Sequence, residues 1–315
     1  MKEAVVGVDI GGTGVKFGLV DKTGNILITS KVKTADYPEP ELIAAAIYKW
    51  ADKEADKLKI KIAGVGIGTP NGNYFKGTID FAPNLPWKGI IQLKSIFESV
   101  FHTPAALTND AKAAAIGEMY FGNAKGMKDF LFITIGTGLG SGIVVNGKIA
   151  YGYDSLAGEV GHVIIEKNGR QCPCGRKGCL EQYVSAPGIV KTYYELLRNK
   201  NLDEFRTSLG NMIDSSVLCE KAIAGDETAM EAFQKTGETL GLALANAVCY
   251  TRPEKIFLFG GLTQAGDLIF KPAIESFEEN LLPIYKNKIP ILPSGLKESE
   301  AAILGSASLI WNELK

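Results

Sequence analysis

The sequence predicts an α/β protein built from two similar domains that flank a cleft. A chain of 315 residues is too long for one ordinary hydrophobic core and suits two domains. Its opening pattern is a strand, a glycine-rich turn and further strands, and this pattern recurs so that Gly136 stands 125 residues after Gly11. Solenoid repeats run about 20–50 residues, so the longer offset indicates two related domains.

Apolar runs and turn residues predict the elements of the N-terminal third. Three strands joined by tight turns read as an antiparallel meander, and a helix with a charged outer face follows. The predicted elements, in chain order, are strands 4–10, 16–20 and 26–32, helix 41–59, strands 63–68 and 105–108, and helix 111–121.

The second copy of the pattern is followed by a more helical stretch. Asn146-Gly147 is a turn sequence typical of a hairpin. The predicted elements are strands 130–135 and 143–145, helix 187–198, a buried helix 228–250, strand 256–259 and helix 298–314. We expect a small N-terminal domain of residues 1–118 plus 298–315 and a larger domain of residues 119–297. The hinge would lie near 117–126 and 293–297.

Composition excludes several classes of protein. Hydrophobic residues make up 46% and charged residues 22%, which is normal for a soluble globular protein. A net charge of −1 gives no basic face for nucleic acid. The apolar run at the N-terminus is short and interrupted by Asp9, and the most apolar later stretch is broken by glycines. We therefore expect a cytoplasmic protein without membrane or nucleic-acid partners. We also expect a homo-oligomer, either a dimer or a tetramer.

Two glycine-rich turns are candidate phosphate sites. Gly11-Gly12-Thr13-Gly14 and Gly136-Thr137-Gly138 each end a strand, and glycine lets backbone N–H groups approach an anion closely. Each turn alone is equally consistent with a simple tight hairpin. Asp9 beside the first turn would repel phosphate unless a cation lies between, which suggests a Mg²⁺-side residue or a turn cap. Lys16 either reaches a phosphate or is a solvated lysine.

The two turns also carry a resemblance. Val8-Asp9-Ile10-Gly11-Gly12-Thr13 and Gly136-Thr137-Gly138-Leu139-Gly140 resemble the phosphate motifs of the actin-like ATPase superfamily, and within it the chain resembles the ROK family over nearly its whole length. The resemblance implies two RNase-H-like domains around an active-site cleft, with ATP between the turns. It places Gly260 and Gly261 near adenosine.

Asn109-Asp110 is the candidate acceptor site. Asp110 opens an alanine-rich helix and could simply be its N-cap. However, phosphoryl transfer to a hydroxyl needs a carboxylate near the attacking oxygen, and a strand end facing a cleft is a suitable place. The segment from Asn109 to Ala114 resembles the family's catalytic segment, which makes Asp110 the general base. The resemblance further implies that Asn84, Asn109, Glu159, His162 and Glu181 contact the sugar.

Asn71 departs from the family pattern. The family commonly carries Pro-Gly where this chain has Pro70-Asn71. Asn is the residue besides glycine that best tolerates a positive φ, so the loop can keep its shape. The added side chain would lie near the sugar and bears on which hexose fits.

A cysteine cluster predicts a metal site. His162, Cys172, Cys174 and Cys179 offer four nitrogen and sulfur ligands, which suits a closed tetrahedral Zn²⁺ site with Gly175 and Gly178 at its turns. The alternative is a group of reduced bystander cysteines. An odd total of five cysteines argues against a disulfide framework. The family's zinc signature implies a structural metal, which would fix the His162 tautomer and leave its other nitrogen as a donor. His102 has no such neighbours and is expected at the surface.

The resemblance implies an ATP- and Mg²⁺-dependent hexose kinase of the glucokinase-like branch, acting on the sugar 6-hydroxyl. N-acetylmannosamine, mannose or fructose kinase activity is the alternative within the family. A non-catalytic sugar sensor or a repressor is the alternative of another class. Family repressors carry a DNA-reading domain ahead of the first phosphate motif, whereas eight residues precede Asp9 here.

Overall fold

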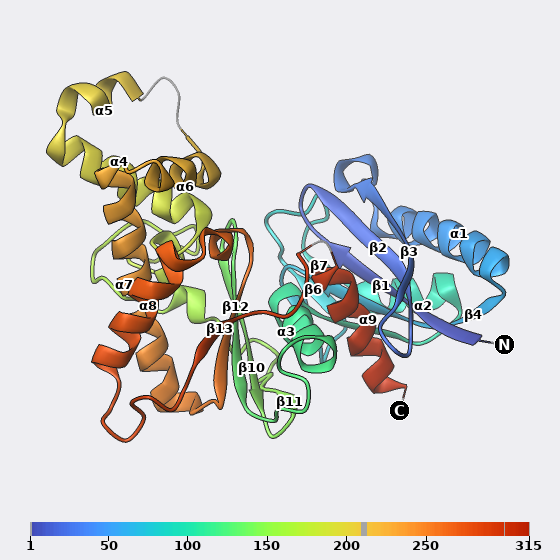
Figure 1. The fold of residues 1–315 in the computed structure, drawn as a ribbon. Helices are drawn as coiled ribbons and strands as arrows, with labels where there is room; N and C mark the ends of the chain where they lie inside the picture. The colour runs from blue at the N-terminus through green and yellow to red at the C-terminus, as the bar shows by residue number, and fades with distance from the viewer. Residues whose placement is uncertain (1, 209–212, 299, 315) are drawn as a thin grey trace. The chain divides into compact units, whose positions relative to one another are not determined.

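Two five-stranded sheets with the same strand order organise the chain (Figure 1). The computed structural model describes residues 2–208, 213–298 and 300–314. The strands of the first sheet are β1 (Lys2–Ile10), β2 (Gly14–Asp21), β3 (Ile26–Lys33), β4 (Ile60–Thr69) and β8 (Ala105–Asn109), in the order β3-β2-β1-β4-β8. The strands of the second are β9 (Phe130–Ile135), β10 (Leu139–Val145), β11 (Lys148–Ile149), β12 (Lys255–Phe259) and β13 (Ile291–Pro293), in the order β11-β10-β9-β12-β13.

The two orders correspond strand for strand, which confirms the predicted duplication. In the first sheet, β1, β2 and β3 form the expected antiparallel meander, and β4 and β8 add in parallel to β1. In the second sheet, β12 is parallel to both β9 and β13. The predicted hairpin turn between β10 and β11 is present, with positive φ at both Asn146 and Gly147.

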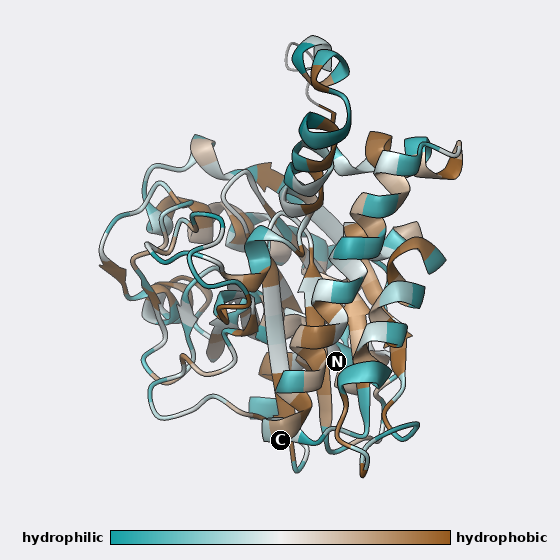
Figure 2. Ribbon diagram, turned by 90° about the vertical axis from the view of Figure 1, so that its left-hand side faces the viewer, coloured by the Kyte–Doolittle hydropathy of each residue, from teal (hydrophilic) through white to brown (hydrophobic). Residues whose placement is uncertain are grey.

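Helices cover both faces of the first sheet. They are α1 (Pro40–Leu58), α2 (Leu93–Phe101), α3 (Asp110–Phe121) and α9 (Ala301–Glu313). On one face Val6 and Val8 of β1 join the core cluster that contains Ile43 and Ile47 of α1. The intervening Gly7 faces α9, where a Cβ would lie 2.3 Å from the carbonyl of Ile303. Close packing on the strand backbone explains why α9 is mostly buried and apolar. In Figure 2, the helices facing the viewer show both hydrophilic and hydrophobic segments.

A separate small sheet in the same unit contacts β8. Strands β5 (Gly72–Asn73), β6 (Thr78–Asp80) and β7 (Ile90–Ile91) pair antiparallel in that order. At Gly72, a Cβ would lie 2.4 Å from the carbonyl of Thr108, so β5 approaches the end of β8 closely.

The second sheet is accompanied by a helical group. It contains α4 (Ala186–Lys200), α5 (Leu202–Ser208), α6 (Ser215–Ile223), α7 (Glu227–Thr251) and α8 (Asp267–Asn280). Helices α7 and α8 pack closely because α7 presents glycine, and a Cβ at Gly241 would lie 2.3 Å from the carbonyl of Ala273. Along α7 a stripe of Ala, Leu and Gly is buried, as the sequence predicts.

Most predicted elements are present with ends that differ by a few residues. Strand β10 begins at Leu139 rather than Ile143, because the strand continues directly from the glycine turn. The last helix begins at Ala301 rather than Glu298, and Ser299 lies outside the described residues. Helices α2, α5, α6 and α8 were not predicted from the sequence.

The contacts divide the chain into two compact units. The first comprises 1–128, 142–158 and 294–315, and the second 129–141 and 159–293. Among the described helices, none combines the length and the apolar character needed to cross a bilayer.

Candidate active site and metal centre

The first glycine turn joins β1 to β2 and is held by local hydrogen bonds. The Gly11 N–H donates to the Gly14 carbonyl at 3.0 Å, and the Thr34 hydroxyl donates to the Gly11 carbonyl at 2.6 Å. Thr34 is fully buried, so this support comes from inside the unit. A Cβ at Gly12 would lie 2.6 Å from the carbonyl of Asn84. The turn therefore lies directly against the loop that carries this predicted sugar ligand.

Strand register brings the predicted acidic residues to one edge of the first sheet. Asp9 of β1 pairs with Gly68 of β4, and Gly68 pairs with Thr108 of β8. The three strands are parallel, so their carboxyl ends meet at one edge, where ligands of open α/β sheets usually bind. A Cβ at Gly68 would lie 3.7 Å from the Cα of Asp110. The small residue at position 68 leaves room for the start of α3.

Asn109, rather than Asp110, caps helix α3. The Asn109 side chain accepts hydrogen bonds from the N–H groups of Ala111 at 3.0 Å and Lys112 at 3.4 Å, while its backbone is extended. The expectation that Asp110 is the N-cap is therefore wrong, because Asp110 is already the first helical residue. One Asp110 oxygen accepts from the Ala111 N–H at 2.7 Å, and the residue is exposed.

The two carboxyl groups at this edge have raised pKa values. Burial and, to a smaller extent, the negative charge of Asp110 raise the pKa of Asp9 to about 6, and the charge of Lys16 opposes this shift. The surrounding protein atoms also desolvate Asp110 and raise its pKa, against the hydrogen bond from Ala111 and the charge of Lys112. A cation bound between these two neighbouring acids would stabilise their ionised form.

The second glycine turn belongs to the other unit and has its own partners. The Gly136 N–H donates to the Gly138 carbonyl at 2.9 Å, and Glu181 Oε2 accepts from the Leu139 N–H at 3.1 Å. A Cβ at Gly138 would lie 2.5 Å from that carboxylate oxygen. Glu181, predicted as a sugar ligand, is thus fixed at the turn by one oxygen.

Gly260 lies beside the same turn. Its φ is 108°, and a Cβ there would lie 2.5 Å from the carbonyl of Ile135, the last residue of β9. No side chain fits this position, which explains the first glycine of the pair Gly260-Gly261. Thr137 is exposed, as a phosphate donor would need to be.

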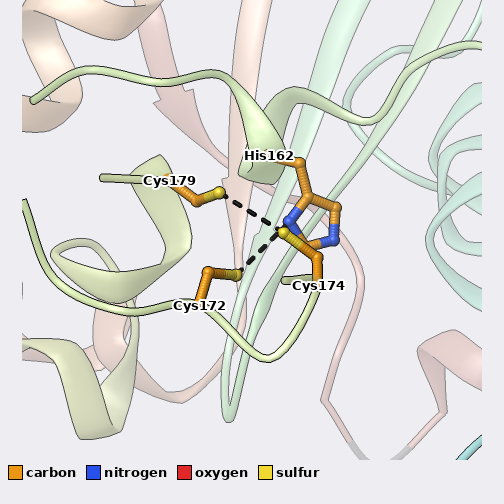
Figure 3. Close-up of side chains that lie close together, drawn as sticks. All are labelled: His162, Cys172, Cys174 and Cys179. Atoms are coloured by element: carbon orange, nitrogen blue, oxygen red, sulfur yellow. Dashed lines mark hydrogen bonds between the residues drawn. The ribbon is translucent and has the colours of Figure 1, made fainter. Parts of the chain in front are cut away.

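The four predicted metal ligands come together in the second unit (Figure 3). Their ligand atoms all lie within 4.8 Å of one another, with 3.8 Å between Cys172 Sγ and His162 Nδ1 and 3.6 Å between the sulfurs of Cys174 and Cys179. Zinc–sulfur bonds of about 2.3 Å at tetrahedral angles place two sulfurs about 3.8 Å apart. The donor set and its spacing therefore fit a tetrahedral Zn²⁺ ion.

The segment around the cysteines is held in a tight double turn. Gly175 and Gly178 have φ of 89° and 76°, as the predicted turns require. The Arg176 guanidinium donates to the His162 carbonyl at 2.7 Å. Hydrogen bonding, chiefly from the Arg176 backbone, lowers the pKa of Cys174 to about 6, which favours the thiolate that binds metal. Nδ1 of His162 faces the sulfurs, and Nε2 points away from them (Figure 3).

The predicted site residues therefore form two groups. The first unit holds Asp9, Gly11, Gly12, Thr13, Lys16, Asn84, Asn109 and Asp110. The second holds Gly136, Thr137, Gly138, Glu159, His162, Cys172, Cys174, Cys179, Glu181, Gly260 and Gly261. His102 is exposed, as expected.

Three buried polar residues, one beside the first glycine turn and two on α3, were not predicted from the sequence. Thr34 supports the first glycine turn, and Lys112 and Glu118 are buried on the helix that begins with Asp110. A lysine and a glutamate in an otherwise small and apolar helix are the signal that could have identified the last two.

The repeated sheet, with a glycine turn after the first strand of each copy, defines the class as the actin-like ATPase fold. The ROK family model matches residues 5–313, and the chain belongs to this family.

Several relatives are kinases. A glucokinase of Halalkalibacterium halodurans is 35% identical over 88% of this chain and 86% of its own length. The structure of a ROK family glucokinase from Streptomyces griseus, in complex with glucose and AMPPNP, is 32% identical, covers 97% of this chain and 98% of its own, and superposes with a TM-score of 0.79. A xylose repressor of Caldicellulosiruptor bescii is 28% identical over 99% of this chain and 79% of the repressor.

Proposed function

We propose that this protein is an ATP-dependent glucokinase that phosphorylates the 6-hydroxyl of the sugar with Asp110 as general base. The observation that carries the proposal is the meeting of Asp110, Asp9 and the first glycine turn at the carboxyl edge of one sheet. The similarity to glucokinases over nearly the whole chain favours glucose among the hexoses.

In the proposed reaction, Asp110 accepts the proton of the attacking hydroxyl. Asn109 accepts from the N–H groups of Ala111 and Lys112. Since the bond from Ala111 to the Asp110 side chain uses a single oxygen, Asp110 keeps acceptor capacity for the substrate. A pKa raised above the ordinary value makes the carboxylate a stronger base. Asn84, Asn109, Glu159, His162 and Glu181 would bind the remaining sugar hydroxyls, because amides, carboxylates and imidazole match groups that both donate and accept.

The glycine turns would bind the phosphates of ATP. Gly11, Gly12 and Thr13 on one unit and Gly136, Thr137 and Gly138 on the other offer backbone N–H and hydroxyl donors. Gly260 and Gly261 would lie near adenosine. Mg²⁺ bound on the Asp9 side would neutralise phosphate charge, and Lys16 would add a positive charge there.

The zinc site would act through geometry. His162, Cys172, Cys174 and Cys179 would hold a structural Zn²⁺, which stabilises the double turn. With Nδ1 on the metal, the His162 Nε2 carries the proton and would donate to a sugar hydroxyl.

The Asn71 side chain is compatible with the loop shape that the family pattern implies. Its φ is 53°, the conformation that glycine would adopt, and its amide donates to the carbonyls of Asp80 at 3.0 Å and Phe81 at 3.3 Å. The added side chain is therefore tied to its own loop. N-acetylmannosamine, mannose and fructose remain the alternative substrates, and a sugar-sensing repressor is the alternative of another class.

A phosphorylation assay tests the proposal. ADP formation would be followed for glucose, mannose, fructose and N-acetylmannosamine, each with ATP, Mg²⁺ and a control without sugar. We expect the largest kcat/KM with glucose and a much slower ATPase without sugar. Absence of sugar-stimulated ADP formation with every hexose would refute the kinase assignment, and preference for another hexose would refute glucose alone.

We further propose a cytoplasmic homodimer or homotetramer that binds no nucleic acid.

A further inference from the structure

A buried lysine lies on the helix that carries the candidate base. Lys112 is 3% exposed and follows Asp110 by two residues on α3. Its Nζ donates a hydrogen bond of 2.8 Å to the carbonyl of Ser155. Lysine is almost never fully buried unless it has a partner, because removing an ammonium group from water is costly. The bond to Ser155 therefore fixes both residues.

The segment that receives this bond is held at two more points. The Asn73 amide donates to the carbonyl of Asp154 at 3.0 Å, and the Tyr74 N–H donates to the Ser155 hydroxyl at 2.9 Å. Ser155 is itself fully buried and has a φ of 74°, which is unfavourable for a residue with a side chain. Such a conformation persists only where surrounding bonds hold it.

The clamped segment leads directly to predicted sugar ligands. Glu159 lies four residues after Ser155, and His162 lies seven residues after Ser155. The chain leaves the first unit between Gly158 and Glu159. Four extended residues reach at most about 14 Å. The position of Ser155 therefore limits where Glu159 can lie.

We propose that Lys112 is a positioning residue for the sugar site, because it fixes the departure point of the segment bearing Glu159 and His162 on the same helix as Asp110. The inference rests on the proposed kinase function and adds a residue that acts through others. The competing view is that Lys112 only stabilises the core.

Steady-state kinetics of Lys112→Met separate the two views. Methionine keeps most of the buried stem but cannot donate to the Ser155 carbonyl. Loss of a hydrogen bond from a charged donor corresponds to a change of about 10-fold or more in an equilibrium constant. We therefore expect the KM for glucose to rise by about that factor. The KM for ATP should stay within about twofold, because the segment that Lys112 holds leads to predicted sugar ligands rather than to the predicted phosphate turns. A core role would lower thermal stability and leave the KM for glucose unchanged.

Two further variants complete the test. Lys148→Met replaces an exposed lysine of β11 and should match the wild type. Ser155→Gly removes the hydroxyl that holds Tyr74 and relaxes the left-handed backbone, so it should also raise the KM for glucose. Unchanged KM values for glucose in folded Lys112→Met and Ser155→Gly, or failure of both to fold, would overturn the inference alone. A wild-type protein that phosphorylates no hexose would instead overturn the proposed function, and the inference with it.

Discussion

Replacing Glu118 should destabilise the protein by an amount set by its hydrogen bonds. This fully buried carboxylate near the end of α3 accepts from the N–H groups of Asn123 at 2.8 Å and Gly295 at 3.1 Å, both through Oε1. Its Oε2 accepts from the hydroxyl of Ser294. Ser294 begins the last stretch of the first unit, and Asn123 lies five residues before Lys128, where its first stretch ends. Glu118 thus secures the chain beside two crossings between units.

The expected magnitude follows from the three bonds. Each hydrogen bond to a charged acceptor contributes about 1.5–3 kcal/mol, and water entering the vacated space would replace part of the loss. We expect Glu118→Ala to lower the free energy of unfolding by about 2–4 kcal/mol. Glu118→Gln keeps one oxygen for both N–H groups and can donate its amide to the Ser294 hydroxyl. Loss of the charge alone should cost about 1–2 kcal/mol.

Urea-induced unfolding, followed by circular dichroism, measures the order of stability. The wild type should be the most stable, Glu118→Gln intermediate and Glu118→Ala the least stable. Glu279→Gln, at an exposed position of α8, is the matched control and should unfold like the wild type. A Glu118→Ala protein as stable as this control would refute the assigned role of the carboxylate.

Three other predictions concern the metal, the carboxyl groups and domain motion. Metal analysis should find one Zn²⁺ per chain, and Cys174→Ser should lose it together with sugar affinity, whereas Cys249→Ser should keep both; a zinc-free, fully active enzyme would contradict this. The pKa of Asp9 is about 6 in the folded protein and 3.8 without perturbation, so the folded state binds the proton more tightly. Protonated Asp9 therefore adds to the free energy of unfolding at low pH, and this contribution is lost as the pH rises from about 4 to 6. Asp9→Asn should therefore gain stability relative to the wild type over that interval. A difference in urea midpoint between the two proteins that is the same at pH 4 and at pH 6.5 would refute the shift. Saturating glucose should make the protein more compact in solution scattering, since a ligand held by both units favours closure; identical profiles would refute closure.

Much of the fold could be predicted because its signals are local. The apolar runs of β1 to β4 and the 125-residue offset between glycine turns gave the strands and the duplication. Helix α8 was not predicted: Pro272 stands inside it, and proline usually ends or kinks a helix. Here close packing against Gly237 of α7 accompanies the proline, since a Cβ at Gly237 would lie 2.5 Å from its ring.

The candidate site could be predicted where the spacing of residues along the sequence indicates their chemistry. The cysteine cluster came together as expected because its members lie within one short segment. The capping of α3 was misassigned between two adjacent residues that can both accept N–H bonds, and only the backbone conformation of Asn109 decides it. Lys112 and Glu118 were missed because their partners lie 43 and 176 residues away, at Ser155 and Ser294. Pairings of this kind leave no local pattern.

The turnover of Asp110→Asn tests the central claim most directly. Asparagine preserves the size of the side chain and its bond to the Ala111 N–H but cannot accept the sugar proton. We predict normal folding and glucose binding, measured by calorimetry, with kcat lowered about 10²–10⁴-fold, the usual contribution of a general base. A folded Asp110→Asn protein that binds glucose and phosphorylates it at a near-normal rate would contradict the account.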